Sequence, residues 1–421
     1  DATVSLGKTL TGDKKTNVLA GVYAASGDVH VNAAGRTLQL QVENTVGNPT
    51  GIYAGNGKNV TVNASEVNII TKGFANGNTL TNAIQLDAAK NAASGITINA
   101  PVNISMTGGL GGNAIAIQKS DRFGEKSYET SGTTRIRING DLTVAGARTD
   151  QWGIPLNRTN VLSRFNNAGI LTQVDGSEVV VGKKTNMTVY GNGVTTNAAG
   201  SKVLLSGGGH ITVPAGTKYS YYALAAYKGS IFMNMGDNGT TPGNGKSPLL
   251  MEDVQLDGDL FALPQGQLNV ALMTNQSYLH GLVDSGGTAN IYLQNGAKWL
   301  NEGRNARYYQ DDEDIGAGTV QKVGGKSVYT AKSHVTNLFG GTSEAARGIL
   351  YQKDISPITI DNYSGHAAAI YRHNPAAPTA IQGGGIVIGN AVGTENVFTL
   401  FTDANGVTAA NQDNVLNALA G

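Results

Sequence analysis

The chain has 421 residues, and its 30 basic and 30 acidic side chains give a formal net charge of zero. A nucleic-acid-binding protein needs a basic excess to displace counterions from phosphates, so this balance argues against nucleic acid as a partner. There is no cysteine, which excludes disulfides and thiolate metal sites. Charged residues make up only 14% and glycines number 58, which is typical of many short strands joined by tight turns.

The first predicted elements are short strands that recur about every 30 residues. One series starts at a small residue, at Gly21, Gly51, Ala83 and Ala114, spaced 30, 32 and 31 residues apart. A second series has two β-branched residues around a variable one and ends in Asn, at 29–32, 60–63, 96–99 and 136–139. A third series follows each time, at 38–40, 67–69, 102–104 and 142–144.

Alternation within the second series predicts which side chains face the interior. Val29 and Val31, with their equivalents in later repeats, are expected to point inward. The variable positions are expected to face solvent: His30, Thr61, Thr97 and Arg137.

Three strands per repeat predict an all-β protein, a right-handed parallel β-helix with coils of about 30 residues and a C-terminal β-rich cap. A single coil cannot bury its inner face alone, so neighbouring coils stack. The recurring Asn is expected to form a hydrogen-bonded ladder at a turn. A β-propeller is disfavoured because its blades need four antiparallel strands and longer repeats.

The coil pattern is predicted to extend over 1–300, with further coils at 169–189, 193–213, 222–234 and 260–270. About a dozen coils would form a rod of roughly 50 to 60 Å. Three stretches interrupt the pattern and are predicted to protrude as loops: 118–134, 146–167 and 236–250.

The candidate ligand-binding residues are aromatic or basic, the types that dominate interface hot spots. Most of them lie in the first two loops, and three tyrosines form a second group. The candidates are Arg122, Phe123, Tyr128, Trp152, Arg158, Arg164, Tyr219, Tyr221 and Tyr222.

The last third of the chain begins with a polar loop, predicted over 301–320, that holds the acidic run Asp311 to Asp314. Four sequence runs follow one another around and after it: LQNGAKW at 293–299, SHVTNL at 333–338, ITIDNYSG at 358–365 and YRHN at 371–374. In this order they resemble the end of the passenger domain of a classical, monomeric autotransporter.

The resemblance implies a location and a domain organisation. Residues 301–375 are expected to form an autochaperone-like, β-sandwich-like cap, and 376–421 a further β segment and a truncated linker toward a membrane barrel outside this chain. Export to the cell surface of a Gram-negative bacterium, with anchoring in the outer membrane, is implied as well. The family includes adhesins, aggregation factors, proteases and esterases.

Catalytic and metal signals in the sequence are weak, so we expect no catalytic residues, no metal and no cofactor. Asp284-Ser285-Gly286-Gly287 matches part of the serine-protease motif, but the glycine before the aspartate is missing and a turn between coils is expected instead. His366 and His373 are the closest histidine pair and are seven residues apart. A calcium site at 108–113 or 311–314 is weighed below a turn and a solvated loop.

These features predict a non-catalytic adhesin or self-association factor for aggregation and biofilm formation. Its partner would be a host or bacterial surface ligand, either glycan or protein, or another passenger. The alternative is a β-helical polysaccharide lyase or glycoside hydrolase. That alternative requires clustered carboxylates on one external face, and the outward positions of the second series offer none.

Overall fold

The computed structural model describes 2–8, 18–44, 48–73, 80–89, 92–107, 111–119, 134–146, 168–214, 222–236, 248–303, 307–309, 316–354, 356–373, 381–382 and 384–402. These residues form β-strands and one 3-10 turn, Glu344–Ala346. None of the helical structure within them has the length and apolar character needed to span a bilayer.

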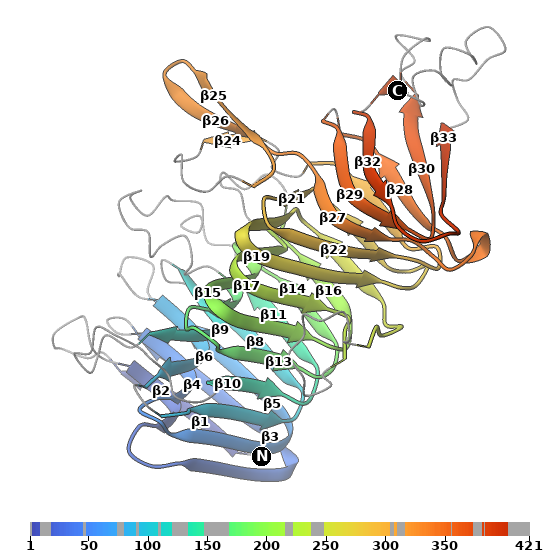
Figure 1. Cartoon of the computed structure of the whole chain (residues 1–421). Coiled ribbons are helices and arrows are strands. Elements are labelled where there is room, and N and C mark those ends of the chain that lie inside the picture. Colours follow the sequence, from blue (N-terminus) through green and yellow to red (C-terminus); the bar gives the residue numbers. More distant parts are fainter. Residues whose placement is uncertain are drawn as a thin grey trace, which may run out of the picture.

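The strands stack into a parallel β-helix with three ladders, as the sequence predicts (Figure 1). In Figure 1 the rod runs from its blue N-terminal end to its red C-terminal end. Up to β21 each coil contributes to all three ladders, and five long strands, β3, β5, β15, β17 and β19, each contribute to two ladders.

Ladder 1 pairs the first strand of each coil. Its strands are β2 (Val18–Ala24), β4 (Asn48–Ala54), β6 (Leu80–Ala88), β9 (Gly111–Lys119), β12 (Ala168–Thr172), the first parts of β15 (Asn192–Leu205), β17 (Leu224–Met233) and β19 (Leu260–Leu272), and β21 (Val283–Ser285).

Ladder 2 pairs the second strand of each coil. Its strands are the first parts of β3 (Val29–Asn44) and β5 (Asn59–Lys72), β7 (Gly95–Asn99), β10 (Arg135–Ile138), β13 (Glu178–Val181), the second parts of β15, β17 and β19, β22 (Thr288–Leu293), β27 (His334–Phe339), β29 (Ile358–Ser364) and β32 (Ile386–Ala391).

Ladder 3 pairs the third strand. Its strands are β1 (Ala2–Lys8), the second parts of β3 and β5, β8 (Val102–Thr107), β11 (Leu142–Gly146), β14 (Thr185–Thr188), β16 (Gly209–Thr212), β18 (Val254–Asp257), β20 (Tyr278–His280), β23 (Lys298–Asn301), β28 (Gly348–Gln352), β30 (His366–His373) and β33 (Val397–Thr402).

The predicted inward and outward sides of ladder 2 are confirmed. Val60 and Val62 are at most 1% exposed and pair in register with Ile96 and Ile98, which are fully buried. Thr61, between them, is partly exposed. Alternation therefore places every second β-branched side chain in one continuous apolar core.

The recurring small residue at the start of ladder 1 has a packing reason. A Cβ added at Gly51 would collide with Ile69 of its own coil and would lie 2.7 Å from the carbonyl oxygen of Ala83 in the next coil. The two coils can approach closely here only because the side chain is absent or, as at Ala83, small.

The predicted Asn ladder is present at the end of the ladder 2 strands. The Asn99 side-chain amide donates to Oδ1 of Asn63 at 2.7 Å, and the Asn139 amide donates to Oδ1 of Asn99 at 2.6 Å. Each amide thus satisfies its neighbour along the rod axis.

The architecture changes at β21, the last described strand of ladder 1. Beyond it only ladders 2 and 3 continue, so the strands from β27 onward form two facing parallel sheets. The C-terminal part is therefore β-rich, as the sequence predicts. The expected boundary at residue 300 falls inside β23, however, and β22 and β23 hydrogen-bond directly to β27 and β28.

A second small sheet projects where ladder 1 ends (Figure 1). It consists of three antiparallel strands, β24 (Arg307–Tyr309), β25 (Thr319–Val323) and β26 (Lys326–Thr330). We call it the hairpin sheet. It corrects the expectation of a plain loop over 301–320, because β24 and the start of β25 fall in that segment; the acidic run at 311–314 lies outside the described residues.

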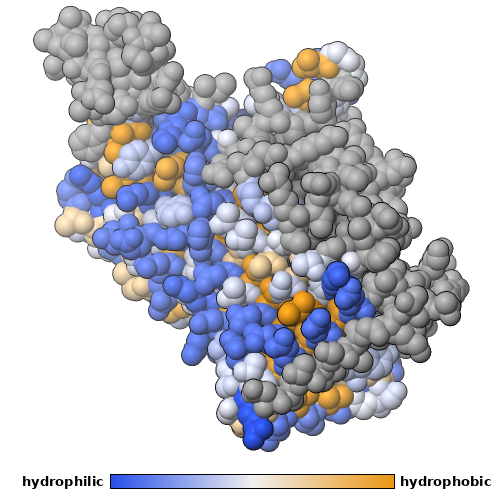
Figure 2. Space-filling view, turned by 180° about the vertical axis from the view of Figure 1, so that it is seen from behind, coloured by the Kyte–Doolittle hydropathy of each residue, from blue (hydrophilic) through white to orange (hydrophobic). Residues whose placement is uncertain are grey.

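Most of the predicted loops also lie outside the described residues, namely 120–133, 147–167 and 237–247. Figure 2 shows that the described part of one side of the molecule is mainly hydrophilic, with hydrophobic residues in small separate patches.

Candidate functional site

The structure describes one of the nine predicted ligand-binding residues, Tyr222. Tyr222 is only 5% exposed. Its ring stacks on Phe261 with centroids 4.6 Å apart, in a cluster that includes Tyr227. Its backbone N–H donates to Oδ1 of Asn192 at 2.9 Å. Tyr222 therefore packs against the outer side of ladder 1.

The other eight predicted binding residues lie outside the described residues. The external faces of the rod are described in more detail, and two of them carry organised polar side chains. They belong to ladders 2 and 3.

The outer face of ladder 2 carries a column of amides toward its C-terminal end. Asn290 donates to Asn269 at 2.8 Å, Asn337 to Asn290 at 2.7 Å, Asn362 to Asn337 at 3.1 Å and Asn390 to Asn362 at 3.4 Å. Asn290 lies between the buried residues Ala289 and Ile291, and the residues that follow Asn337 and Asn362, Leu338 and Tyr363, are buried in the core, so alternation turns these amides outward. We call these five residues the amide column.

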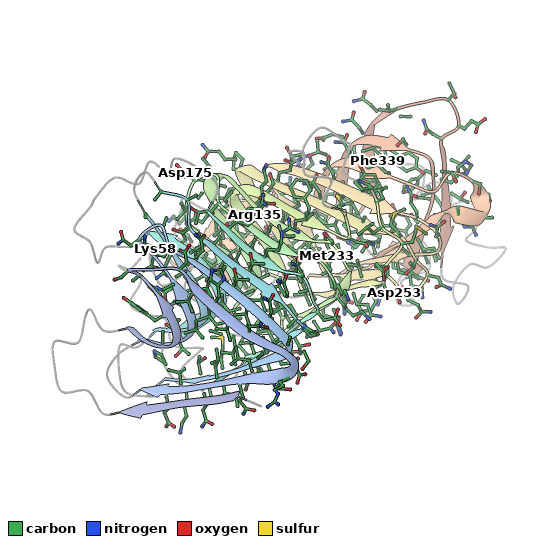
Figure 3. The ribbon with its side chains drawn as sticks, turned by 90° about the horizontal axis from the view of Figure 1, so that it is seen from below. Lys58, Arg135, Asp175, Met233, Asp253 and Phe339 are labelled. Atoms are coloured by element: carbon green, nitrogen blue, oxygen red, sulfur yellow. The ribbon has the colours of Figure 1, made fainter. Side chains whose placement is uncertain are left out.

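Two aromatic rings lie beside the amide column. Tyr292 and Phe339 pair in register on β22 and β27, and their rings stack with centroids 4.4 Å apart. Both are partly exposed, and partial burial raises the pKa of the Tyr292 phenol. Tyr292 pairs with Ala271 of the preceding coil and packs against the buried outer cluster that contains Ala271, and Phe339 pairs with Ser364 of the following coil. Figure 3 shows Phe339 toward the C-terminal end of the rod.

The outer face of ladder 3 carries a network of titratable groups. Asp257 accepts a hydrogen bond from the Tyr278 hydroxyl and contacts Nε2 of His210, both at 2.9 Å. His280 lies between two carboxylates, with Nδ1 3.6 Å from Asp257 and Nε2 3.4 Å from Glu302. Lys353 lies 3.6 Å from the same Glu302 oxygen.

The sequence interpretation missed this network because it examined only the outward positions of ladder 2. The signal was available in the alternation of 254–257 and 278–280, which places Gln255, Asp257, Tyr278 and His280 on one outer face. The geometry is that of a satisfied network. Both nitrogens of His280 face carboxylates, and Asp257 contacts Tyr278, His210 and His280.

The protease-like run at 284–287 coincides only in part with the expected turn, because Gly286 and Gly287 form the bend between β21 and β22 while the first two residues do not. Asp284 and Ser285 belong to β21 and both are fully buried. Ser285 pairs with Ala262, and its hydroxyl has no hydrogen-bond partner. His334 binds the backbone oxygen of Ser285 rather than this hydroxyl. The Ser285 hydroxyl is therefore enclosed and makes no hydrogen bond to a base of the kind that activates a nucleophile.

Within the described part of the chain, no three His, Asp or Glu side chains are grouped so as to hold a metal ion. Comparison with protein families, with curated proteins and with solved structures finds no match for this chain.

Proposed function

We propose that the chain is a non-catalytic surface adhesin or self-association factor. The observation that supports this best is the amide column on the outer face of ladder 2, with the stacked and partly exposed rings of Tyr292 and Phe339 beside it. Asn269 is buried, but the amides of Asn290, Asn337, Asn362 and Asn390 are at least partly exposed and can both donate and accept, and the aromatic rings add apolar contact area. Such a face suits lateral binding to a ligand rich in hydroxyl or amide groups.

Self-association fits the same chemistry. An amide is complementary to another amide, so the column on one rod can hydrogen-bond to the column on a second rod. The net charge of zero also leaves no overall repulsion between copies. A glycan fits as well, because its hydroxyls both donate and accept and its ring faces pack on aromatic side chains.

The passenger-like sequence runs support a surface location. LQNGAKW forms the turn between β22 and β23, where Asn295 and Gly296 adopt φ values of 53° and 78°. The SHVTNL and ITIDNYSG runs lie in β27 and β29, in the two-ladder part of the rod. We propose that this part corresponds to the autochaperone-like segment of a similar autotransporter passenger, displayed outside a Gram-negative cell.

Binding to the amide column can be tested on the purified chain. We expect self-association in sedimentation velocity at increasing concentration, or binding on a glycan array, and loss of that binding when Asn337→Thr and Asn362→Thr are combined. The matched control is Asn99→Thr in the other Asn ladder, where the equivalent amide bond has the same length of 2.7 Å. Binding by neither route in the wild type, or equal loss in the control, would contradict the proposal.

A second candidate function, cleavage of a glycan, is favoured by the carboxylates of the ladder 3 network. Asp257 and Glu302 flank His280 on a face that consecutive coils share, and Lys353 adds a cation. Glycan-cleaving enzymes use paired carboxylates for acid and base catalysis. Release of reducing ends from neutral or acidic polysaccharides, abolished by Asp257→Asn and by Glu302→Gln, would establish this function in place of simple binding.

A further inference from the structure

The end of ladder 1 carries a buried carboxyl group that none of the binding faces uses. Asp284 sits in β21 between Val283 and Ser285, and its side chain points outward from the coil. It is nevertheless fully buried. The side chain must therefore be covered from outside the rod.

The hairpin sheet supplies that cover. The hydroxyl of Tyr329, in β26, donates to both carboxyl oxygens of Asp284 at 2.9 Å. The N–H of Ala317 donates to Oδ1 at 2.6 Å, and the N–H of Gly318 donates to the Tyr329 oxygen at 2.8 Å. One carboxyl group thus joins β21, the last described strand of ladder 1, to β26 and to the residues just before β25.

Apolar contact at this junction is limited. Tyr329 and Ala331 pack on Leu282, with Val320 partly buried against them. This is a small cluster compared with the continuous core of the rod. Hydrogen bonds to Asp284 therefore contribute a large share of the interactions that hold the hairpin sheet on the rod. A change in the protonation of that carboxyl group should change how stably the hairpin sheet docks.

The groups that face Asp284 are few. From the hairpin sheet they are the Tyr329 hydroxyl and the two backbone N–H groups. From the preceding coil it is Asp259, a second buried carboxyl that accepts from the N–H of Leu282. Within the described residues no Lys, Arg or His forms an ion pair with Asp284. These groups do not fully compensate the cost of burying a negative charge on Asp284.

We propose that the hairpin sheet is a proton-controlled latch, which closes over the end of ladder 1 when Asp284 is protonated and loosens when Asp284 is ionised. Closing buries Asp284 and Leu282 beneath the hairpin sheet and encloses the Tyr329 side chain between the sheet and the rod. Loosening exposes them and the outer side of β21. The latch would adjust how firmly the last three-stranded coil is covered, according to the pH outside the rod.

The direction of the pH dependence follows from the surroundings of the carboxyl group. Burial raises the pKa of Asp284 from 3.8 to about 7, with a smaller contribution from the charge of Asp259, while the bonds from Tyr329, Ala317 and Gly318 oppose the rise. An undocked hairpin sheet would leave the carboxyl in water with its ordinary pKa. The docked form therefore holds the proton more tightly. Docking is strongest at low pH and weakens as the pH rises from about 4 to about 7.

Hydrogen exchange of the intact chain tests the latch directly. After correction for the intrinsic pH dependence of exchange, protection of 316–330 should be at least about 10-fold higher near pH 5 than near pH 8. Protection of β19 and β22 serves as the internal reference and should not change. Asp284→Asn cannot ionise and should remove the pH dependence of 316–330.

Two further variants separate the latch from a merely structural contact. Asp175→Asn changes an exposed carboxyl that also accepts a backbone N–H, and it should keep the wild-type pH dependence. Tyr329→Phe removes a donor that favours the ionised form, so it should lower protection more near pH 8 than near pH 5. Equal protection of 316–330 at both pH values in the wild type would overturn the proposal. So would wild-type pH dependence in Asp284→Asn or, if that variant does not fold, an equal effect of Tyr329→Phe at both pH values.

Discussion

At the scale of single residues, strand alternation decides which side chains the fold depends on. Ile98 lies between Val62 and Ile138 in the core, and all three are fully buried. Thr97, one residue earlier, faces outward beside Arg137. Because the side-chain period of a strand is two, neighbouring positions in the sequence have opposite environments.

We therefore expect Ile98→Asp to lower the free energy of unfolding by about 4 kcal/mol or more, because it places an unpaired charge in the core. Thr97→Asp should change the free energy of unfolding by less than about 0.5 kcal/mol. Chemical denaturation of both variants, followed by circular dichroism, measures the difference. Similar losses in the two variants would show that the assignment of inner and outer faces is wrong.

Alternation could be read from the sequence, but it did not reveal which outward residues are exposed. Tyr53 and Gln85 point outward from ladder 1 and are at most 1% exposed. They share Asp87, which accepts from the Tyr53 hydroxyl at 2.9 Å and from the Gln85 amide at 2.7 Å. Tyr222 is buried on the same ladder. Whether an outer face is covered depends on contacts between segments far apart in the chain, and a periodic pattern does not contain them.

Asp87→Ala should accordingly destabilise the rod although the position lies outside the main core. The substitution removes an acceptor from a buried hydroxyl and a buried amide, and we expect a loss of about 2–4 kcal/mol in the free energy of unfolding. The matched control is Glu43→Ala on ladder 3, which removes an exposed ion pair with Lys72. It should lower the free energy of unfolding by less than about 1 kcal/mol. An equal effect of the two substitutions would contradict this view of ladder 1.

At the scale of elements, the strands of the first coils could be predicted because each repeats a recognisable triplet. Val60, Ile96 and Ile136 occupy equivalent positions in the sequence and pair in register in the structure. The hairpin sheet could not be predicted in this way. It is inserted between β23 and β27, so Ile291 pairs with Leu338, 47 residues later, and the local period gives no sign of where ladder 1 stops.

The continuation of ladders 2 and 3 past β23 predicts that the C-terminal part assists folding. A new coil forms most easily on an existing edge, because coil stability depends on contacts with its neighbours. We expect residues 1–303 to refold faster and in higher yield when 304–421 are supplied in trans, as followed by β-sheet circular dichroism. The cut at 303 keeps β23 whole. Equal rate and yield of refolding with and without 304–421 would contradict this prediction.

At the scale of the whole molecule, the rod and its long loops should be separable. In the second coil, four residues at 55–58 suffice to connect β4 to β5, whereas β9 and β10 are 15 residues apart. Replacing 120–133 with the turn sequence of 55–58 should preserve the circular dichroism spectrum, because the strands on either side keep their pairing partners. Loss of the β-sheet signal would show that the segment belongs to the fold.

The same replacement tests the predicted binding residues Arg122, Phe123 and Tyr128. Arg and Tyr commonly dominate binding energies, so adhesion of displaying cells should fall when these residues are removed. Adhesion that persists undiminished would contradict a role for this segment and would leave binding to the described faces of the rod.

The central claim is that the rod binds through the amide column on the outer face of ladder 2. The most direct measurement is aggregation and surface adhesion of cells that display equal amounts of the wild type, the combined Asn337→Thr and Asn362→Thr variant, or Asn99→Thr. Each amide lost should cost about 1 kcal/mol of stability, so the combined variant should lose about 2 kcal/mol and Asn99→Thr about 1 kcal/mol, and both should leave the rod folded. The account predicts that cells displaying the combined variant lose aggregation or adhesion while Asn99→Thr cells keep it. Wild-type behaviour of the combined variant would contradict the account.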